Sequence, residues 1–407
     1  MGFYKLTIRD IPLDNLMVLV RADYNVPLTD KGDISDDLRI RASLPTINYL
    51  LEHGCKVVIM SHLGRPESND RTLTLEPIAQ RLAELLGKDV RFVDRCIGDK
   101  VFQAIKRAPK NSVIVLENLR FHKEEEANDV DFAKQIAKST SARYFVQDGF
   151  GVVHRAHAST SAITQFIPSV AGLLLEREYT TITSAMESPK LPLVAVIGGA
   201  KIKDKIPLIE RFVKIADQII IGGALANTFL AKNGLSVGKS KVETDEYDVI
   251  DGIYSLASEK SDLEEEQFIV LPGDLAVGSS LTSEAKRRIV DLESVDGNDY
   301  VLDIGDKTIE KIIKIVDTAG TVIWNGTLGY AELPEFAHGS ARLALALAEH
   351  PEVTSIIGGG DTADFVTKWD GQGGKSFTHV STGGGASLEL MSGVKLPGIE
   401  SLLDSKK

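Results

Sequence analysis

Arginine and histidine residues gather at the ends of apolar runs in the first half of the chain. The guanidinium group of arginine is a planar fork that can hold phosphate or carboxylate oxygens in pairs. One arginine alone is usually an ordinary surface or ion-paired residue, whereas several together indicate a ligand site. This group predicts a site for a small, multiply charged acid, and its members are Arg21, Arg39, Arg65, Arg120, Arg155, His62 and His154.

Other polar residues near this group refine the prediction. Asp23 and Asn25 follow the first apolar run and can recognise a hydroxyl group of the same ligand. His154 and His157 stand in an H-x-x-H spacing, which also occurs in metal sites. A zinc site needs three or four ligands with supporting partners, whereas this segment offers arginine and alanine instead. We therefore expect His62 and His154 to donate hydrogen bonds to an anion.

Two lysines in the second half follow a glycine pair and suit a polyphosphate. The motif GGAK at residues 198–201 is expected to start a helix, which would place Lys201 and Lys205 one turn apart, about 6 Å along its axis. Glycine-rich segments at residues 358–362 and 381–387 are expected to begin further helices, whose free N–H groups attract phosphate. The second half therefore predicts a nucleotide-sized phosphate site.

Asp361 lies within one of these glycine-rich segments and can have two roles. A carboxylate beside a polyphosphate is repelled unless a cation lies between them, and Mg²⁺ takes one or two carboxylates together with phosphate oxygens. Aspartate in front of a helix is also a common N-cap. The sequence leaves both roles open.

Apolar runs are the elements that must position these groups. Unbroken Val/Ile/Leu runs, such as those at residues 194–197 and 57–60, are typical of strands buried on both faces, and open parallel sheets bind ligands beyond their strand carboxyl ends. Helical patterns alternate with these runs; one covers residues 75–87, with Thr74 as its expected N-cap and Gly87 as its stop. The alternation predicts an α/β fold with two Rossmann-like domains, each a parallel sheet with helices on both faces.

Length and composition bound the class of protein. The 407 residues exceed one compact core and imply about two or three domains. The formal net charge of −12 argues against a nucleic-acid partner, and no apolar run approaches the ~18 residues of a membrane span. Residues 1–10 lack the apolar core of a signal peptide, so we expect a cytoplasmic protein. Cys55 and Cys96 are expected to be two buried thiols.

Two common nucleotide-binding signatures are missing. The segment GDLAVGSS at residues 273–280 has the P-loop spacing but serine in the lysine position, and no G-x-G-x-x-G fits a strand-to-helix turn followed by an acid. These gaps disfavour a GTPase and a nicotinamide dehydrogenase. A non-catalytic binding protein stays open as an alternative.

The chain resembles the phosphoglycerate kinase family in motifs that follow that family's order over essentially the whole length. One glycine triplet would be weak support, whereas the co-linear set is specific. The motifs are VRADYNVPL (20–28), DLRIRASLPTI (37–47), SHLGRP (61–66), ENLRF (117–121), GFGVVHRAHAST (149–160), GGAKIKDKI (198–206), GGALANTFL (222–230), WNGTLGYAE (324–332), GGGDT (358–362) and STGGGASLEL (381–390).

The resemblance implies reversible phosphoryl transfer from 1,3-bisphosphoglycerate to ADP, giving 3-phosphoglycerate and ATP in glycolysis or its reverse. It also implies Mg²⁺ on the nucleotide, a monomer, direct in-line transfer, and two domains that face each other across a cleft and close about a helical hinge. The implied domains are residues 1–172 with 390–407 for the triose phosphate, residues 173–192 as the hinge, and residues 193–389 for the nucleotide.

The resemblance also assigns roles to individual residues. Phosphoryl transfer needs alignment and charge neutralisation more than covalent chemistry. We therefore expect Arg39 and Lys201 to cradle the transferring group and Lys205 to bind terminal phosphate oxygens. The matching triose ligands are Asp23, Asn25, Arg39, His62, Arg65, Arg120 and Arg155. The candidate nucleotide ligands are Lys201, Lys205, Gly223, Asn325, Glu332 for the ribose, Gly358, Gly359, Gly360, Asp361, Thr362, Gly383, Gly384 and Gly385, with Asp361 also near Mg²⁺.

Several positions depart from the family's usual pattern. None of the departures removes a charge that the reaction needs, so they leave the expected type of reaction unchanged. Gly149 and Thr327 lie near the sites and are expected to loosen the local backbone. The segment at residues 286–300 also fits the family poorly. The departing residues are Gln147, Gly149, Val152, Val153, Asp306 and Thr327.

Overall fold

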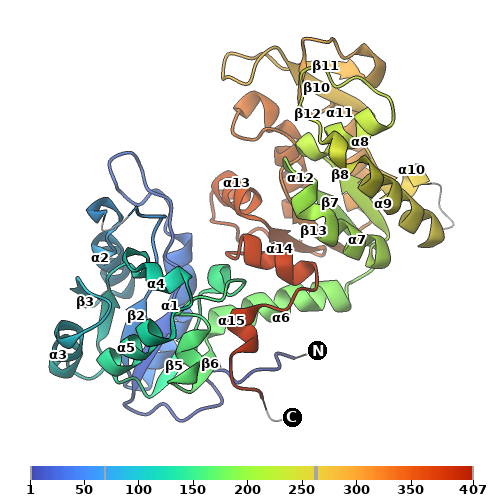
Figure 1. Ribbon diagram of the computed structural model, residues 1–407. Coiled ribbons are helices and arrows are strands. Elements are labelled where there is room, and N and C mark those ends of the chain that lie inside the picture. The colour runs from blue at the N-terminus through green and yellow to red at the C-terminus, as the bar shows by residue number, and fades with distance from the viewer. Residues whose placement is uncertain (1, 68–69, 261–264, 406–407) are drawn as a thin grey trace. The chain divides into compact units, whose positions relative to one another are not determined.

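The computed structural model describes residues 2–67, 70–260 and 265–405 of the chain, which divides into two compact units (Figure 1). Unit 1 comprises Met1–Thr180 and Lys395–Lys407, and unit 2 comprises Thr181–Val394. The division lies within helix α6 (Leu173–Glu187), in the helical stretch that the sequence indicated between its two halves. Each unit has its own parallel sheet and its own hydrophobic core.

A six-stranded parallel sheet forms the centre of unit 1, in the order β3-β4-β2-β1-β5-β6. Its inner strands are short apolar runs that are buried along almost their whole length, as expected for strands covered on both faces. The strands are β1 (Met17–Arg21), β2 (Lys56–Met60), β3 (Val90–Val93), β4 (Val113–Leu116), β5 (Tyr144–Gln147) and β6 (Ser169–Ala171).

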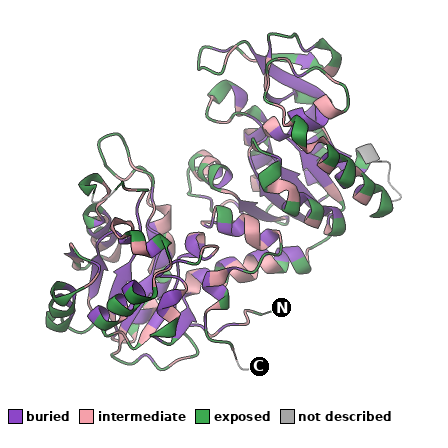
Figure 2. Cartoon of the chain, in the orientation of Figure 1, coloured by how far each residue is buried: buried purple, intermediate pink, exposed green. Residues whose placement is uncertain are grey.

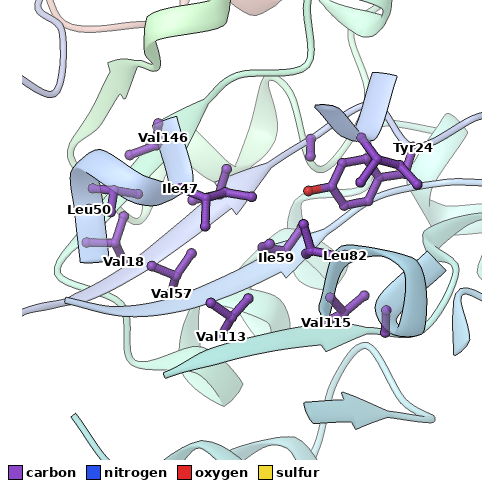
Figure 3. Close-up of a cluster of buried hydrophobic side chains, with 14 of the residues drawn as sticks. Val18, Tyr24, Ile47, Leu50, Val57, Ile59, Leu82, Val113, Val115 and Val146 are labelled. Atoms are coloured by element: carbon purple, nitrogen blue, oxygen red, sulfur yellow. The ribbon is translucent and has the colours of Figure 1, made fainter. Parts of the chain in front are cut away.

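Alternate side chains of these strands form one hydrophobic cluster with the helices on one face of the sheet (Figure 3). Val18, Val57, Val113 and Val146 come from four strands and share the cluster with Ile47 of α1. The intervening strand residues point to the opposite face and are buried as well, so helices cover both faces. The helices are α1 (Leu38–Glu52), α2 (Glu76–Leu86), α3 (Asp99–Arg107), α4 (Lys123–Glu126), α5 (Val130–Thr140) and α15 (Pro397–Glu400).

The start of α2 differs from the sequence-based expectation. The helix begins at Glu76 and its N-cap is Leu75, so the expected N-cap at Thr74 is wrong. The carboxylate of Glu117 accepts hydrogen bonds from the Leu75 N–H at 3.0 Å and from the Thr74 hydroxyl at 2.9 Å. Hydrogen-bond donors at the start of α2 are therefore satisfied by a residue far away in sequence. The expected stop at Gly87 is confirmed, because this residue adopts the left-handed conformation with φ 63°.

A second six-stranded parallel sheet lies in unit 2, in the order β15-β14-β13-β7-β8-β9. Strands β7 and β13 pair in register to their last residues, Ile197 and Asn325, so their carboxyl ends lie side by side. The parallel α/β architecture predicted for each half of the chain is thus confirmed. The strands are β7 (Leu193–Ile197), β8 (Gln218–Ile221), β9 (Ile269–Val270), β13 (Thr321–Asn325), β14 (Thr354–Gly358) and β15 (His379–Val380).

A three-stranded antiparallel sheet in unit 2 was not expected from the sequence. Strand β10 (Asp274–Gly278) pairs with both β11 (Arg288–Asp291) and β12 (Tyr300–Ile304). The chain leaves the parallel sheet after the short β9 (Ile269–Val270) and enters β10 at Asp274. Strand β11 lies in the segment that resembles the family poorly.

Helices pack on the parallel sheet of unit 2 through an extensive apolar core. Trp324 of β13 is fully buried and shares a cluster with Ile312 of α11 and Leu343 of α12. The helices of this unit are α7 (Ile206–Ile215), α8 (Gly223–Lys232), α9 (Tyr247–Lys260), α10 (Glu265–Phe268), α11 (Asp306–Val316), α12 (His338–Glu349), α13 (Gly360–Asp370) and α14 (Gly385–Met391).

Burial follows the strands in both units, whereas exposed residues lie mainly on helix surfaces and loops (Figure 2). Within the described ranges, no helix combines the length and apolar character that a membrane crossing requires. Cys55 and Cys96 are both buried and form no disulfide. The prediction of two buried thiols is therefore confirmed.

Candidate active site

The predicted anion ligands of unit 1 lie at the carboxyl ends of adjacent parallel strands. Arg21 ends β1 and is in register with Met60 at the end of β2 and with Gln147 at the end of β5. The loops after these strands therefore start side by side. They carry Asp23, Asn25, His62, Arg65, His154 and Arg155, while Arg120 follows β4 in a short 3-10 turn.

Hydrogen bonds join three of these loops to one another, and one of the loops to helix α1. Oδ2 of Asp23 accepts a hydrogen bond at 2.8 Å from Nη1 of Arg39, in the first turn of α1. Oδ1 of Asn25 accepts one at 2.8 Å from the backbone N–H of Gly64. Nη1 of Arg120 donates to the carbonyl oxygen of Gly64 at 2.6 Å. The structure therefore brings these predicted ligands together.

The arginines of this site are close enough to shift one another's pKa values. Partial burial lowers the pKa of Arg120, and the positive charges of Arg155 and Arg65 lower it further, while the carboxylate of Glu126 opposes the change. Nε of Arg120 lies 3.2 Å from that carboxylate. Arg65 is exposed, and Arg39 and Arg155 are partly exposed, so their guanidinium groups are accessible to a ligand.

Arg21 differs from these arginines because its side chain is only 1% exposed. Its Nε donates to Oγ of Ser159 at 2.7 Å, and its Nη1 donates to the carbonyl oxygen of Ala22. Its Nη2 lies 3.2 Å from Nδ1 of His62 and 3.9 Å from Oε1 of Glu125. The structure thus places Arg21 inside the fold, in contact with a predicted ligand, rather than on the surface of the site.

Both predicted histidine ligands have lowered pKa values. Burial and the charge of Arg21 hold the pKa of His62 well below its usual range. Burial and the charge of Arg155 lower the pKa of His154, although the carboxylate of Asp23 opposes the change. Burial also lowers the pKa of His157, to about 4. These imidazoles are therefore neutral at neutral pH.

Sequence reasoning missed Glu125 and Ser159 as members of this region. Glu125 lies in the run KEEEA, and charge runs are usually solvated, yet its side chain is only 1% exposed. Its Oε1 accepts a hydrogen bond from the Ser159 hydroxyl at 2.5 Å, and its Oε2 accepts one from the Ser159 N–H at 3.0 Å. The only sequence signals are that Ser159 lies inside the motif at residues 149–160 and that Glu125 lies four positions after the motif at residues 117–121.

The predicted phosphate site of unit 2 also lies at strand carboxyl ends. Nζ of Lys205 donates to the carbonyl oxygen of Asn325, the last residue of β13, at 3.0 Å, and to the Oδ1 atom of the same residue. Burial lowers the pKa of Lys205 to about 8, while the carboxylates of Asp361 and Asp204 oppose the change. Lys205, Asn325 and Asp361 therefore share one region.

The expectation that GGAK starts a helix is wrong. A 3-10 turn covers Lys203–Lys205, and helix α7 begins only at Ile206. Pro207 suits this start because the first turn of a helix does not use its N–H groups. Lys201 consequently lies outside a helix and is exposed. The predicted spacing of one helical turn between Lys201 and Lys205 does not hold.

Glycines at this edge of unit 2 serve two purposes. Gly326 has φ 99°, and a Cβ at this residue would lie 2.2 Å from the carbonyl oxygen of Gly198. A Cβ on Gly223 would lie 2.6 Å from the nearest backbone atom. These glycines let the loops after β7, β8 and β13 touch one another, so backbone packing explains them. At Gly360 and Gly384, in contrast, a Cβ would meet no atom within 4 Å, so space for a ligand is available.

Asp361 is an exposed residue in the first turn of α13. The N-cap of this helix is Gly359, so the N-cap role that the sequence left open for Asp361 is excluded. Across the described part of the chain, no group of three or more His, Cys, Asp or Glu residues is arranged to hold a metal ion. A cation near Asp361 would therefore need most of its ligands from a bound molecule.

Buried polar groups beside α13 point to a ligand. Oγ1 of Thr362 accepts a hydrogen bond from the Gly326 N–H at 2.7 Å, which joins α13 to the loop after β13. Nδ2 of Asn325 is buried and has no hydrogen-bond partner among the described residues. Buried N–H groups are rarely left unpaired, so this donor is available to water or to a ligand.

The other predicted nucleotide ligands lie in loops at the same end of unit 2. Glu332 is exposed in the loop after β13. Gly358 ends β14 and is buried, and Gly383 precedes the first residue of α14, Gly385. Helix α14 has only 7 residues, whereas α13 has 11. The dipole of α14 is therefore expected to attract phosphate less strongly than the dipole of α13.

Three departures from the family pattern have structural explanations. A Cβ on Gly149 would lie 3.1 Å from the backbone nitrogen of Asp23, so glycine allows the loops after β5 and β1 to pack closely. Oγ1 of Thr327 donates at 2.9 Å to a carbonyl oxygen two residues further on. Asp306 is the first residue of α11 and forms an ion pair with Arg287 at 3.0 Å.

Comparison with known proteins gives the family of this chain. The family model described as "Phosphoglycerate kinase" matches residues 8–394. A phosphoglycerate kinase from Dictyoglomus turgidum is 45% identical over 399 residues, which cover 98% of this chain and 98% of that protein. One from Moorella thermoacetica is 44% identical over 401 residues, with 98% and 99% covered. The chain belongs to the phosphoglycerate kinase family.

Solved structures agree with this result. The phosphoglycerate kinase from Coxiella burnetii superposes with a TM-score of 0.83 at 36% identity and 98% coverage of both chains. The one from Pyrococcus horikoshii OT3 gives a TM-score of 0.84 at 33% identity, again with 98% coverage of both. The family resemblance and the predicted phosphotransferase reaction of glycolysis are therefore confirmed, with a nucleotide as co-substrate. The dehydrogenase alternative is wrong.

Proposed function

We propose that unit 1 binds 3-phosphoglycerate or 1,3-bisphosphoglycerate, and that unit 2 binds ADP or ATP. One observation supports this assignment most strongly. Accessible guanidinium groups gather at the sheet edge of unit 1, where the charges of Arg65 and Arg155 act on Arg120. A ligand with phosphate and carboxylate groups would neutralise this positive charge and use the planar forks.

In unit 1 the arginines near the strand ends contact the triose phosphate. Arg39, Arg65, Arg120 and Arg155 bind its phosphate and carboxylate oxygens. Asp23 orients Arg39 through the 2.8 Å hydrogen bond and lies close enough to a ligand held there to accept from its hydroxyl group. The other predicted members of this site are Asn25, His62 and His154, whereas Arg21 acts from the interior through His62.

In unit 2 the nucleotide phosphates lie between Lys205 and the start of α13. Lys205 supplies positive charge, and the unpaired Nδ2 of Asn325 supplies a donor. The free N–H groups at the start of α13, together with the open space at Gly360, suit phosphate oxygens. Glu332 accepts from the ribose hydroxyls. Gly383, Gly384 and Gly385 contribute further backbone donors.

Asp361 fits a magnesium ion that is held mainly by nucleotide phosphates. The residue is exposed beside Lys205, whose pKa its carboxylate raises, so it has the place and charge for such a contact. Mg²⁺ usually combines one or two carboxylates with substrate phosphates, which agrees with a single aspartate. The ion would offset the negative charge of the nucleotide.

The transfer itself needs positioning rather than a covalent intermediate on the protein. Arg39 from unit 1 and the exposed Lys201 from unit 2 neutralise the transferring group during direct in-line transfer. Reacting atoms must come within about 3–3.5 Å, so substrates held by two separate units require the units to close. Small-angle scattering tests this: both substrates together should lower the radius of gyration, and an unchanged value would count against closure.

A coupled assay that follows ATP formation from 1,3-bisphosphoglycerate and ADP tests the proposed reaction directly. The full chain with Mg²⁺ should form ATP, and the rate should fall when a chelator removes the ion. Binding of both substrates without turnover would instead support the non-catalytic alternative.

We also propose that the protein is a cytoplasmic monomer. The two free, buried cysteines agree with a reducing compartment. Sedimentation equilibrium should give a mass close to the 44.2 kDa of one chain, and a larger mass would contradict the monomer.

A further inference from the structure

Each of the two histidines in the site of unit 1 receives a hydrogen bond from an arginine. Nη2 of Arg21 lies 3.2 Å from Nδ1 of His62, and Nε of Arg155 lies 3.1 Å from Nε2 of His154. An arginine side chain has only donors, so the imidazole nitrogen must accept in both pairs. The proton of each neutral ring must therefore lie on its other nitrogen.

A doubly protonated His62 does not fit this geometry. Its Nδ1–H would face an N–H of Arg21 at 3.2 Å, whereas the nearest carboxylate oxygen, on Asp23, lies 4.0 Å away, beyond hydrogen-bond distance. The charged groups that act on this buried ring are mainly positive, namely Arg21, Arg120 and Arg39, and they favour its neutral form. His62 therefore carries its proton on Nε2.

His154 carries its proton on the opposite nitrogen. Nδ1 of His154 is buried and has no hydrogen-bond partner among the described residues, so the structure leaves one N–H donor unused there. The carboxylate of Asp23 acts on this ring, which places it near the hydrogen bond between Asp23 and Arg39. An acceptor oxygen from a ligand would satisfy the unused donor.

A buried set of contacts fixes the arginine behind His62. Nε of Arg21 donates to the hydroxyl of Ser159, and that hydroxyl donates to Glu125. Both carboxylate oxygens of Glu125 are used by Ser159, and the guanidinium group lies 3.9 Å from one of them. Arg21 and Glu125 are each 1% exposed, so neither side chain can contact a ligand in solvent.

We propose that the site recognises its anion through two neutral histidines held in opposite tautomers, His62 as an Nε2–H donor and His154 as an Nδ1–H donor. Arg21, Glu125 and Ser159 are positioning residues that act through His62. The inference rests on the proposed binding of a phosphorylated acid to unit 1. It gives the site two hydrogen-bond donors that add no charge to the arginine cluster.

Nitrogen-15 NMR of the imidazole rings in the full, ligand-free chain tests the tautomers. His62 and His154 are assigned by the loss of their signals in His62→Asn and His154→Asn. At pH ~7 both rings should be neutral with the stated proton positions. A doubly protonated ring, or the other tautomer, in either residue at pH ~7 overturns the proposal.

His53 provides an internal control in the same spectrum. Its Nδ1 lies 2.8 Å from the carbonyl oxygen of Tyr49, so this nitrogen must carry a proton. The spectrum should therefore show His53 and His62 with opposite states at Nδ1. This difference confirms that the spectra distinguish the tautomers.

Addition of 3-phosphoglycerate tests separately whether the two histidines contact the ligand and whether unit 1 binds it at all. The ligand should shift Nε2–H of His62 and Nδ1–H of His154. If backbone signals of Arg39 and Arg65 shift but both imidazoles stay unchanged, the histidines do not recognise the ligand and the proposal is wrong. If none of these signals shifts, the proposed binding of the triose phosphate to unit 1 fails.

The variant Glu125→Gln tests the positioning role. It keeps one side-chain oxygen for Ser159, replaces the other by an amide group and removes the charge opposite Arg21. His62 should therefore show a mixture of tautomers, and KM for 3-phosphoglycerate should rise while KM for ATP stays unchanged. Glu117→Gln is the matched control, because it removes another buried carboxylate of unit 1 that contacts neither histidine. An unchanged His62 signal in folded Glu125→Gln would remove Glu125 from this role.

Discussion

The candidate ligand sites of unit 1 and unit 2 both lie at the carboxyl ends of parallel strands, but they are built differently. In unit 1 the ligands are side chains that are tied to other side chains and loops, as in the contacts of Asp23, Arg39 and Arg120. In unit 2 the loops after β7, β8 and β13 are held by close contacts between glycine backbones. Ligand binding in unit 1 is therefore expected to depend on charge placement, and in unit 2 on backbone geometry.

The largest effect is expected when a positive charge is removed from the site of unit 1. Arg39→Ala should lower turnover by about 10³-fold or more, because an arginine directed at a transferring phosphoryl group can contribute ~10³–10⁵ in rate. The affinity for ADP should stay nearly unchanged. Steady-state kinetics and calorimetric titration of ADP measure both quantities.

Arg41→Ala is the matched control for this experiment. Arg41 lies in the same helix, is more exposed, and forms its ion pair with Asp37 rather than with a site residue. It should keep normal turnover. Equal losses in the two variants would mean that Arg39 acts only through the stability of α1.

Two alanine substitutions test the backbone geometry of unit 2. Gly326→Ala forces a side chain into a left-handed conformation and into the Gly198 carbonyl, so the free energy of unfolding should fall by at least about 1–3 kcal/mol. Gly360→Ala meets open space, so its stability should change by no more than about 0.5 kcal/mol, while KM for ADP rises. Urea unfolding and kinetics test the pair; similar stability of both variants would contradict the packing role.

The pH dependence of ADP binding tests whether Lys205 binds the nucleotide in its charged form. Its pKa is lowered to about 8, mainly by burial, so the ammonium group loses its proton as the pH rises through this value. The affinity for ADP should therefore decrease above pH ~8, and bound phosphate should raise this pKa so that binding takes up protons. Calorimetry in buffers of different ionisation enthalpy measures the uptake.

Lys205→Met should remove both effects, and Lys203→Met, in the same turn, should keep them. In the free protein the unfolded chain binds more protons than the folded one above pH ~8, so this group makes stability rise with pH there. Proton uptake that persists in Lys205→Met would assign the titration to another group.

The smallest expected effect concerns Asp148, which follows β5 in unit 1. Its buried carboxylate accepts hydrogen bonds from the Thr46 hydroxyl and the Leu174 N–H, and burial raises its pKa to about 7. The folded chain therefore binds more protons than the unfolded chain between about pH 4 and 7, and this contribution to stability is lost as the pH rises.

Asp148→Asn should remove this contribution. The variant should become more stable relative to the original chain as the pH rises from about 5 to 8, because the original must then bury a charge. Urea unfolding at both pH values measures the change. An equal difference in stability at the two values would contradict the raised pKa.

Much of the fold could be predicted from the sequence, because buried parallel strands leave a direct pattern. Unbroken apolar runs ending at Arg21 or Asn325 mark both the strands and the sheet edges where the predicted site residues lie. The antiparallel sheet around β10 could not be predicted, since its pairing depends on contacts far away in sequence. The start of α2 was missed for the same reason, because Glu117 satisfies it from another loop.

The candidate site divides in the same way. Residue types and positions in the sequence indicated which residues lie near one another at the strand ends. They did not indicate how deeply each side chain is buried. Arg21 and Arg39 look equivalent in sequence, yet one is buried behind His62 and the other is accessible. Glu125 was missed because only tertiary packing turns the middle of a charge run inward. Lys201 and Lys205 were placed on one helix because the local pattern does not show that α7 starts at Ile206.

Hydrogen–deuterium exchange with each substrate added separately tests the central claim, that the two units hold different substrates. We expect 3-phosphoglycerate to slow exchange in residues 61–66, 117–121 and 149–157, and ADP with Mg²⁺ to slow it in residues 198–206 and 358–362. Protection of the second set by 3-phosphoglycerate alone, with the first set unchanged, would contradict it.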